Sequence, residues 1–219
     1  MSFVPYRPER LSAEESLVRA QAIFERLEGR RSVREFSSDP VSRELIELAI
    51  RAASTAPSGA HMQPWTFAAI SSAELKAKIR VAAEAEEKES YERRMSDEWR
   101  QALAHLGTDW RKPYLELVPW IVVLFVQRYA PAPEGGKTKH YYVTESCGIA
   151  AGMFIAALHE MGLATLTHTP SPMRFLSELL GRPLHETPLI LFPIGYPAPE
   201  ALVPDLKRKA LDEVSVWYE

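Results

Sequence analysis

The run Ile121–Val126 limits the possible folds of this chain more than any other segment. All of its residues, IVVLFV, are apolar, and most of them are β-branched. A continuous apolar run of this length is typical of a strand that is buried rather than half exposed. We therefore expect a buried strand over Ile121–Val126.

A second apolar segment, Tyr142–Met161, predicts a helix with very few charges, and Gly162 stands where such a helix would stop. Gly148 and Gly152 are three intervening residues apart, and several alanines lie near them. Small residues at this spacing let two helices approach closely. We expect this helix to lie at an oligomer axis or deep in the core.

The remaining elements follow from periodicity and capping residues. Strands are expected over residues 65–70, 163–167 and 189–194, and helices over residues 11–27, from 43, from 72 and near 175–180. Helices and strands mix without regular alternation, which favours an α+β fold. The length suits a single domain over residues 1–219.

Several local details of these elements can also be predicted. Ser42 is the expected cap of the second helix, whose apolar face would carry Leu45, Leu48, Ala49 and Ala52. A capping box of Ser71 and Glu74 would open the third helix. A turn-rich stretch over residues 55–64 and a Pro- and Gly-rich loop ending at Lys139 would connect strands.

Composition excludes several functional classes. The chain is 46% hydrophobic and 25% charged, with a net charge of -3 and no polybasic tract, so nothing suggests a nucleic-acid partner. Neither a signal peptide nor a membrane-spanning run is visible, and we expect a cytoplasmic protein without a membrane association. The histidines lack ligand-like spacing and Cys147 is the single cysteine, so we predict no metal.

The segment from 84 to 112 is highly charged but also aromatic. Glu87 and Tyr91 are four residues apart, which places a carboxylate and a phenol on one helical face. Lys112 arrives just before Pro113, where a helix must stop. Such a movable segment could hold a ligand with both an amine and an acid, such as an amino acid. The alternative is a surface helix with aromatic anchors.

Three shorter motifs carry possible binding groups. Arg30, Ser32 and Arg34 would point to one side of an extended segment, a geometry suited to a phosphate, although such clusters are often surface charge. The turn that begins at Pro57 and Ser58 could direct backbone N–H groups at an anion or a flavin edge, or form a plain loop. Pro170 holds the preceding Thr169 extended.

Taken together, these segments resemble the flavin-dependent nitroreductase superfamily, and within it the iodotyrosine deiodinase branch. The resemblance covers nearly the whole chain after about Leu27. It rests on RRSVREF, TAPSGAHMQPWTF, the EEKESYERRM segment, HYYVTESCGIAAG, TLTHTP, LLGRP, PIGYP and VPDLKRK. The first two are shared by much of the superfamily, whereas Glu87, Tyr91 and Lys112 together are more specific to the branch.

The resemblance implies a nitroreductase-like α+β fold, with a mixed β-sheet flanked by helices, in an intertwined homodimer with FMN at the interface. Residues 84–112 would form a lid over the substrate. The FMN contacts implied by the resemblance come from the arginine segment, the turn, the TLTHTP segment and the C-terminal tail: Arg30, Arg31, Ser32, Arg34, Pro57, Ser58, Thr167, His168, Thr169 and Arg208.

The implied reaction is the reductive dehalogenation of mono- or diiodotyrosine to tyrosine and halide by reduced FMN. The Thr169 hydroxyl would bond the flavin N5 and favour one-electron steps. Glu87 would bind the substrate ammonium and Lys112 its carboxylate, with Tyr91 alongside and the Ala60 backbone at the phenolate oxygen. No nicotinamide motif is visible, so the electron donor is not identified.

The sequence departs from this family at two positions and leaves three alternatives open. His168 stands where many relatives carry threonine, and Met62 where a small polar residue is common. Either residue could shift the pocket. The alternatives are a general FMN-dependent NAD(P)H nitroreductase or quinone reductase, a flavin-consuming enzyme of the dimethylbenzimidazole-synthase type, and a binding protein without catalysis.

Overall fold

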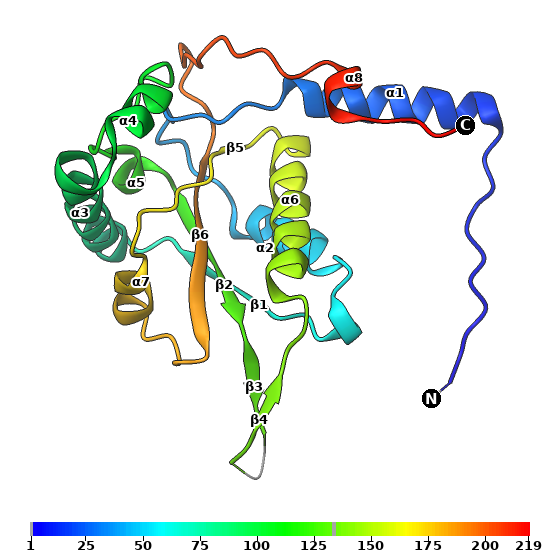
Figure 1. The fold of residues 1–219 in the computed structure, drawn as a ribbon, viewed down its shortest axis with the longest axis horizontal. Coiled ribbons are helices and arrows are strands. Elements are labelled where there is room, and N and C mark those ends of the chain that lie inside the picture. Colours follow the sequence, from blue (N-terminus) through cyan, green and yellow to red (C-terminus); the bar gives the residue numbers. More distant parts are fainter. Residues whose placement is uncertain (1, 133–134) are drawn as a thin grey trace.

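A four-stranded antiparallel sheet organises the structure, a computed structural model that describes residues 2–132 and 135–219 (Figure 1). The strand order is β1-β2-β6-β5. Their bounds are Trp65–Ile70 for β1, Trp120–Gln127 for β2, Ala164–Thr165 for β5 and Glu186–Gly195 for β6. The strands expected over residues 65–70, 121–126 and 189–194 are confirmed. The strand expected over residues 163–167 is only two residues long in the structure.

Strand β2 is buried on both faces, as its apolar run predicted. Its even-numbered residues from Val122 to Val126 join one core, and its odd-numbered residues from Ile121 to Phe125 join the other. This alternation follows from the two-residue period of a strand. The observed strand pairs are antiparallel, and an isolated bridge between Ser32 and Thr165 supplies a parallel contact, so the expected mixed sheet is mainly antiparallel.

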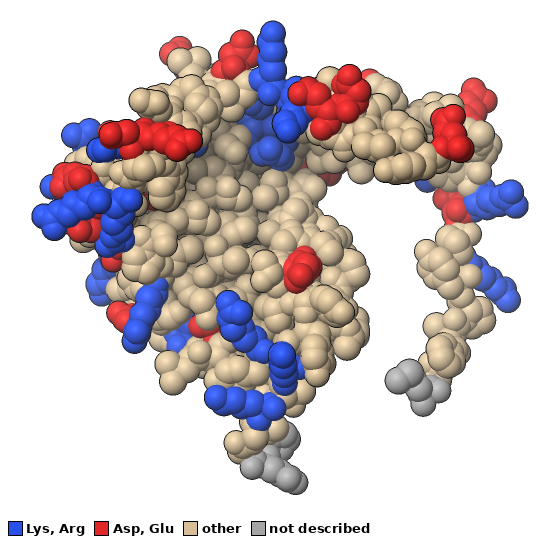
Figure 2. Space-filling model, viewed as in Figure 1, with Lys and Arg blue, Asp and Glu red and all other residues tan. Residues whose placement is uncertain are grey.

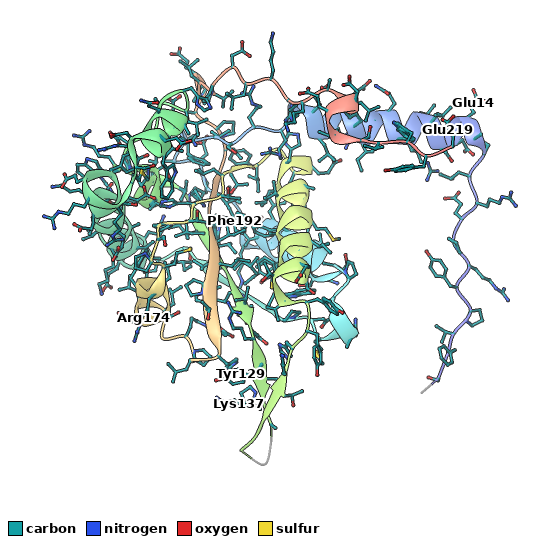
Figure 3. The ribbon with its side chains drawn as sticks, in the orientation of Figure 1. Glu14, Tyr129, Lys137, Arg174, Phe192 and Glu219 are labelled. Carbon is teal, nitrogen blue, oxygen red and sulfur yellow. The ribbon has the colours of Figure 1, made fainter. Side chains whose placement is uncertain are left out.

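Helices α2 (Arg43–Ser54) and α6 (Val143–Glu160) pack together on the first face. Phe154 of α6 lies with its ring centroid 5.3 Å from that of Phe67 and 5.2 Å from that of Phe192, the residue labelled near the centre of Figure 3. Burying a side chain of this size contributes about 1.5–3 kcal/mol. The layer therefore fixes α6 firmly against the sheet.

The predicted inner face of α2 was only partly right. Ser42 caps the helix, as expected, by accepting a hydrogen bond from the Leu45 backbone. The buried residues are Ile46, Ala49 and Ala53, whereas Leu48 is 46% exposed. Each buried residue lies one position after a residue of the predicted apolar face, namely after Leu45, Leu48 or Ala52. The buried face of the helix is therefore rotated relative to the predicted one.

Helices α3 (Ala73–Glu89), α5 (Tyr114–Leu117) and α7 (Arg174–Leu179) cover the opposite face of the sheet. The cap of α3 is Ser72, which accepts from the Leu75 backbone, so the predicted Ser71 capping box is wrong. A π-helical turn, η2 (Ser90–Arg94), continues α3, and α4 (Asp97–Ala104) follows it. The end of α3, these two elements and the residues up to Lys112 make up the segment predicted as a lid, residues 84–112.

The expected loop before Lys139 contains a short hairpin. Strands β3 (Tyr129–Pro131) and β4 (Lys137–Lys139) pair antiparallel, and they project from the main sheet (Figure 1). Residues 133 and 134 of this expected loop lie outside the described residues. The Lys137 ammonium stands 4.5 Å from the Tyr129 ring centroid, and Figure 3 labels both residues on the hairpin. Pro and Gly content alone did not indicate these strands.

Helix α6 has one face buried in the core, which is one of the two locations expected for it, and one exposed face. Cys147, Ala150 and Leu158 are buried in the core. Gly148 and Gly152 are exposed, and Ile149 between them is 45% exposed. The helix ends before Gly162, whose positive φ of 73° suits glycine. None of the helices in the described part of the chain could cross a membrane.

Helix α1 (Ala13–Gly29) projects from the body of the structure (Figure 1). None of its seventeen residues is buried, although Leu17, Ile23 and Phe24 are large and apolar, with exposures of 72%, 60% and 56%. Near the C-terminus, past α8 (Leu211–Val214), Trp217 is 73% exposed. Exposed apolar side chains gathered on extended arms are typical of a surface that another chain covers.

A buried carboxylate ties β6 to its surroundings. Glu186 is 6% exposed and accepts two hydrogen bonds from Arg182, at 2.6 and 2.9 Å, and one from Thr66 at 2.7 Å. Burial by itself would raise the pKa of Glu186. The hydrogen bonds outweigh burial and hold this pKa below its usual value.

Replacing this carboxylate should destabilise the protein in a pH-dependent way. Glu186→Gln should lower the free energy of unfolding by about 1.5–3 kcal/mol at neutral pH. Because the folded-state pKa is depressed, the stabilisation is present above the unfolded-state value of 4.5 and is lost as the pH falls through the folded-state pKa. Urea unfolding of the wild type and of Glu186→Gln, at neutral and at acid pH, measures the difference in the free energy of unfolding under both conditions.

The matched control is Glu178→Gln, which breaks an exposed pair with Arg174 and should have little effect. A difference between wild type and Glu186→Gln that stays constant from neutral pH into acid would contradict this assignment.

Candidate active site

The segment predicted as a lid contacts the chain after β5 through Arg94. Arg94, at the end of η2, pairs with Glu86 at 2.9 Å and donates to the backbone oxygen of Ser171 at 2.8 Å. Tyr91 lies on η2 itself rather than on α3. π-helical turns are rare and often occur at functional sites, because the extra residue in the turn redirects side chains.

Three charged or titratable side chains meet where the lid contacts the segment after β5. The carboxylate of Glu87 lies 3.8 Å from the Lys112 ammonium and 3.1 Å from the His168 ring. Their side-chain exposures are 14%, 4% and 6%, so all three are largely removed from water. We call Glu87, Lys112 and His168 the buried charge cluster. The first two were predicted to act together, whereas His168 was expected beside the cofactor.

The two charged groups shift one another's pKa. Burial lowers the pKa of Lys112, and Glu87 opposes that shift. For Glu87, burial raises the pKa, but the hydrogen bond with His168 and the charge of Lys112 outweigh it, so the pKa falls below its usual value. Glu87 is therefore an anion at neutral pH.

Polar groups of the lid complete the surroundings of Lys112. Its ammonium donates to the Thr108 hydroxyl at 3.2 Å and to the Asp109 backbone oxygen. The Tyr91 hydroxyl donates to the Thr108 backbone oxygen at 3.4 Å, and the Tyr91 ring lies with its centroid 5.8 Å from the ammonium. The predicted carboxylate, phenol and ammonium therefore lie together on the lid.

A cavity of about 290 Å³ opens beside the buried charge cluster. Thr167 and Thr169, both exposed, form part of its wall. Its other lining residues include four lid residues to which no role was assigned: Met95, Trp99, Leu103 and Leu106. Their spacing of three or four positions in a charged segment is the pattern that could have identified them.

A second cavity, of about 340 Å³, is lined by basic residues. The basic residues come from the N-terminal segment and from the C-terminal tail, and Ser32 lies among them: Arg30, Arg31, Arg34, Lys207 and Arg208. Figure 2 shows Lys and Arg side chains gathered in the hollow between the lid helices and α1. We call this group the arginine cradle.

Hydrogen bonds hold the arginine cradle together. Arg208 donates to the backbone oxygen of Arg30 at 2.9 Å, and Arg31 donates to that of Pro204. Burial, followed by the charges of Arg208 and Arg31, lowers the pKa of Arg30. An anion placed here would relieve that repulsion. Arg34 lines both cavities, so the two sites adjoin.

The predicted turn residues lie apart from both cavities. Pro57, Ser58 and Ala60 do not line either cavity in the described part of the chain. The Gly59 backbone donates to the Ser146 hydroxyl, near the start of α6, at 3.3 Å. A Cβ on Gly59 would come within 2.7 Å of the Tyr141 oxygen, so this close approach requires glycine.

Helix α6 separates the turn from the arginine cradle. Arg30 and Arg31 lie near its C-terminal end, where they border a pocket with His159 and Gly162. An α-helix rises about 1.5 Å per residue, so the 18 residues of α6 span about 27 Å. The expected FMN contacts are therefore not brought together within one chain.

Comparison with known proteins places this arrangement in context. A model of the Nitroreductase family matches residues 27–196. Iodotyrosine deiodinase of Haliscomenobacter hydrossis is 51% identical over 217 residues, which cover 99% of this chain and 98% of that protein. Iodotyrosine deiodinase 1 of Mus musculus is 46% identical over 216 residues, covering 97% of this chain and 75% of the mouse protein.

Solved structures agree with this relationship. Oxidized iodotyrosine deiodinase bound to FMN and 3-iodo-L-tyrosine matches with a TM-score of 0.78 and 26% identity, over 90% of this chain and 98% of that one. A nitroreductase with bound FMN from Bacteroides fragilis has a TM-score of 0.65 at 20% identity, over 90% and 98% of the two chains, and shares the fold.

Proposed function

Since this chain belongs to the nitroreductase family, we propose that it removes halide from halotyrosines by reduction with FMN. The reaction converts mono- or diiodotyrosine to tyrosine and halide. The observation that carries the proposal is the pairing of Glu87 and Lys112 beside a cavity, with both side chains largely buried. The close resemblance to iodotyrosine deiodinases supports the same substrate class.

The buried charge cluster suits an amino acid in its zwitterionic form. Glu87 would accept hydrogen bonds from the ligand ammonium, and Lys112 would donate to the ligand carboxylate. Each hydrogen bond to a charged group contributes about 1.5–3 kcal/mol when water is excluded. Tyr91, whose ring packs against the Lys112 ammonium, would lie alongside the ligand backbone.

The arginine cradle fits the phosphate of FMN. Its guanidinium groups converge on a cavity of about 340 Å³, and the lowered pKa of Arg30 reflects burial and the positive charges around it. Guanidinium groups bind phosphate through paired, charge-assisted hydrogen bonds. Arg30, Arg31, Ser32, Arg34 and Arg208 would hold the phosphate end, and the adjoining cavity would receive the ring at Thr167 and Thr169.

The chemistry needs two electrons and one proton as the carbon–halogen bond breaks, a carbon–hydrogen bond forms and halide leaves. Bound FMN, once reduced, supplies the electrons in single steps. The chain's own part is to bind and orient the ligand. The lid would exclude water from the cavity, and the Thr169 hydroxyl would donate to the flavin ring.

We propose that the functional unit is a homodimer with FMN at the interface. Two observations support it: α6 separates the turn from the arginine cradle, and α1 exposes apolar side chains while burying none. A second copy would bring its own Pro57, Ser58 and Ala60 to the cavities of the first. Figure 2 shows a broad face over α6 that carries few charges.

Two further expectations stay predictions. They are a single domain over residues 1–219 and a cytoplasmic location.

Anaerobic turnover tests the proposed reaction directly. The FMN-loaded, dithionite-reduced protein should release iodide from 3-iodotyrosine, and Glu87→Gln and Lys112→Met should each weaken halotyrosine binding by about 10- to 100-fold, because each removes one charged hydrogen bond. Flavin content should not change. Halide electrode readings and quenching of flavin fluorescence provide the two measurements.

Glu89→Gln is the matched control, because Glu89 lies on the same helix but pairs with Arg93 at the surface, 3.5 Å away. A general FMN-dependent reductase would reduce nitroaromatics quickly and be indifferent to Glu87. No iodide release from the wild-type protein would rule out the proposed reaction.

The exposed face of α6 allows a test of the homodimer. A Cβ on Gly152 meets no atom within 4 Å, so a single chain accommodates Gly152→Glu, and loss of a helical glycine favours the helix. We expect this variant to keep its circular dichroism spectrum but to sediment as a monomer and lose FMN. Val81→Glu, at a position 69% exposed on α3, should remain dimeric. A dimeric, FMN-loaded Gly152→Glu protein would contradict the interface.

A further inference from the structure

His168 is held in a fixed position beneath the lid. Its backbone N–H donates to the Leu191 oxygen and its own oxygen accepts from the Leu191 N–H, both at 2.9 Å. The ring packs edge-on against Tyr114, with centroids 6.3 Å apart and planes at 74°. The residue is 5% exposed. The backbone of His168 is therefore fixed to β6, and its ring is packed against α5.

Side chains alternate along the segment that holds His168. Thr167 and Thr169 are exposed, whereas His168 between them is buried and reaches the lid. Its Nε2 lies 3.1 Å from the Glu87 Oε1 atom. Because Glu87 comes from the end of α3, this contact joins the lid to the sheet across 81 residues of sequence.

We propose that His168 is a positioning residue that, in its neutral form, orients the Glu87 carboxylate to bind the ammonium group of the substrate. This inference rests on the proposed function, since it deepens the account of the same site. It assigns to His168 a role toward the lid, in place of the cofactor contact expected from the sequence.

The charge balance explains why the neutral imidazole is needed. With neutral His168, Glu87 and Lys112 cancel, and a zwitterion adds one charge of each sign. A protonated His168 would leave the cluster with a surplus positive charge beside the site of the ligand ammonium. Like charges a few ångströms apart in a buried site disfavour binding.

Other charged and titratable groups face this cluster and remain the same in any comparison of His168 variants. They are Glu84 on α3, Tyr91 on η2, Asp109 on the lid, Tyr114 on α5, and Arg34 of the arginine cradle. Burial raises the pKa of Glu87, but the hydrogen bond with His168 and the charge of Lys112 outweigh burial and hold this pKa below its usual value.

The second ring nitrogen supports the neutral form of His168 in the binding state. Among the described residues, His168 Nδ1 is a buried side-chain atom without a hydrogen-bond partner. If Nε2–H donates to Glu87, the neutral ring leaves a lone pair at Nδ1. Protonation would instead place an N–H there without an acceptor, which a buried site disfavours.

Two ligands separate the effect on the ammonium from other effects of pH. The FMN-loaded oxidised protein is titrated with 3-iodotyrosine and with 3-(3-iodo-4-hydroxyphenyl)propionate, which has the same ring and carboxylate but lacks the ammonium. Histidine ordinarily changes charge between about pH 5 and 8. We expect the preference for 3-iodotyrosine to fall about tenfold or more from pH 8 to pH 5.5.

A non-titrating replacement assigns the effect to His168. His168→Gln keeps an N–H donor for Glu87, so its preference for 3-iodotyrosine should persist at both pH values with FMN still bound. His105→Gln is the matched control, because His105 is an exposed histidine on the same lid, and it should retain the wild-type profile.

The outcomes separate the two proposals. A wild-type preference for 3-iodotyrosine that is the same at pH 8 and pH 5.5 would overturn the role of His168, whatever the variants do. A His168→Gln profile that follows the wild type would do so as well. If the wild-type protein shows no preference at pH 8, the proposed binding of the ligand ammonium by Glu87 fails instead.

Discussion

The rigidity of α6 determines how a complete site can form. This helix holds the turn of Pro57 and Ser58 near its first residues and lies beside the arginine cradle at its other end, about 27 Å away. Its core face is packed against the sheet, so it cannot bend to bring them together. Its other face leaves Gly148 and Gly152 exposed. The same helix therefore keeps the turn and the arginine cradle apart within one chain, and its exposed face is the surface on which we propose that a second copy packs.

The lid depends on a different physical constraint, which is the cost of burying charge. Removing Glu87 and Lys112 from water is unfavourable, and their contact of 3.8 Å recovers only part of that cost. A buried pair of this kind is weak evidence for stability and better evidence for binding. A zwitterion that enters the cavity can satisfy both groups at once, and His168 fixes the direction in which Glu87 presents its oxygens.

The sequence predicted the structure best where only one arrangement of the backbone buries the apolar residues. The apolar run of β2, the strand at Trp65–Ile70 and the bounds of α6 followed directly from composition and periodicity. The position of His168 did not, because its contact with Glu87 joins parts of the chain that are 81 residues apart. The π-helical turn at Tyr91 and the β3–β4 hairpin carry no local signal that distinguishes them from a helix and a loop.

Mixed dimers test most directly whether two chains build each site. One chain carries Glu87→Gln, the other Ala60→Trp at an exposed position of the turn, and the heterodimer is purified through two different tags. If Glu87 of one chain works with Ala60 of the other, the heterodimer contains one intact site and releases iodide at a low 3-iodotyrosine concentration, at which both variant homodimers are much slower. If both residues served the same chain's site, the heterodimer would contain no intact site, and absence of iodide release would contradict the account.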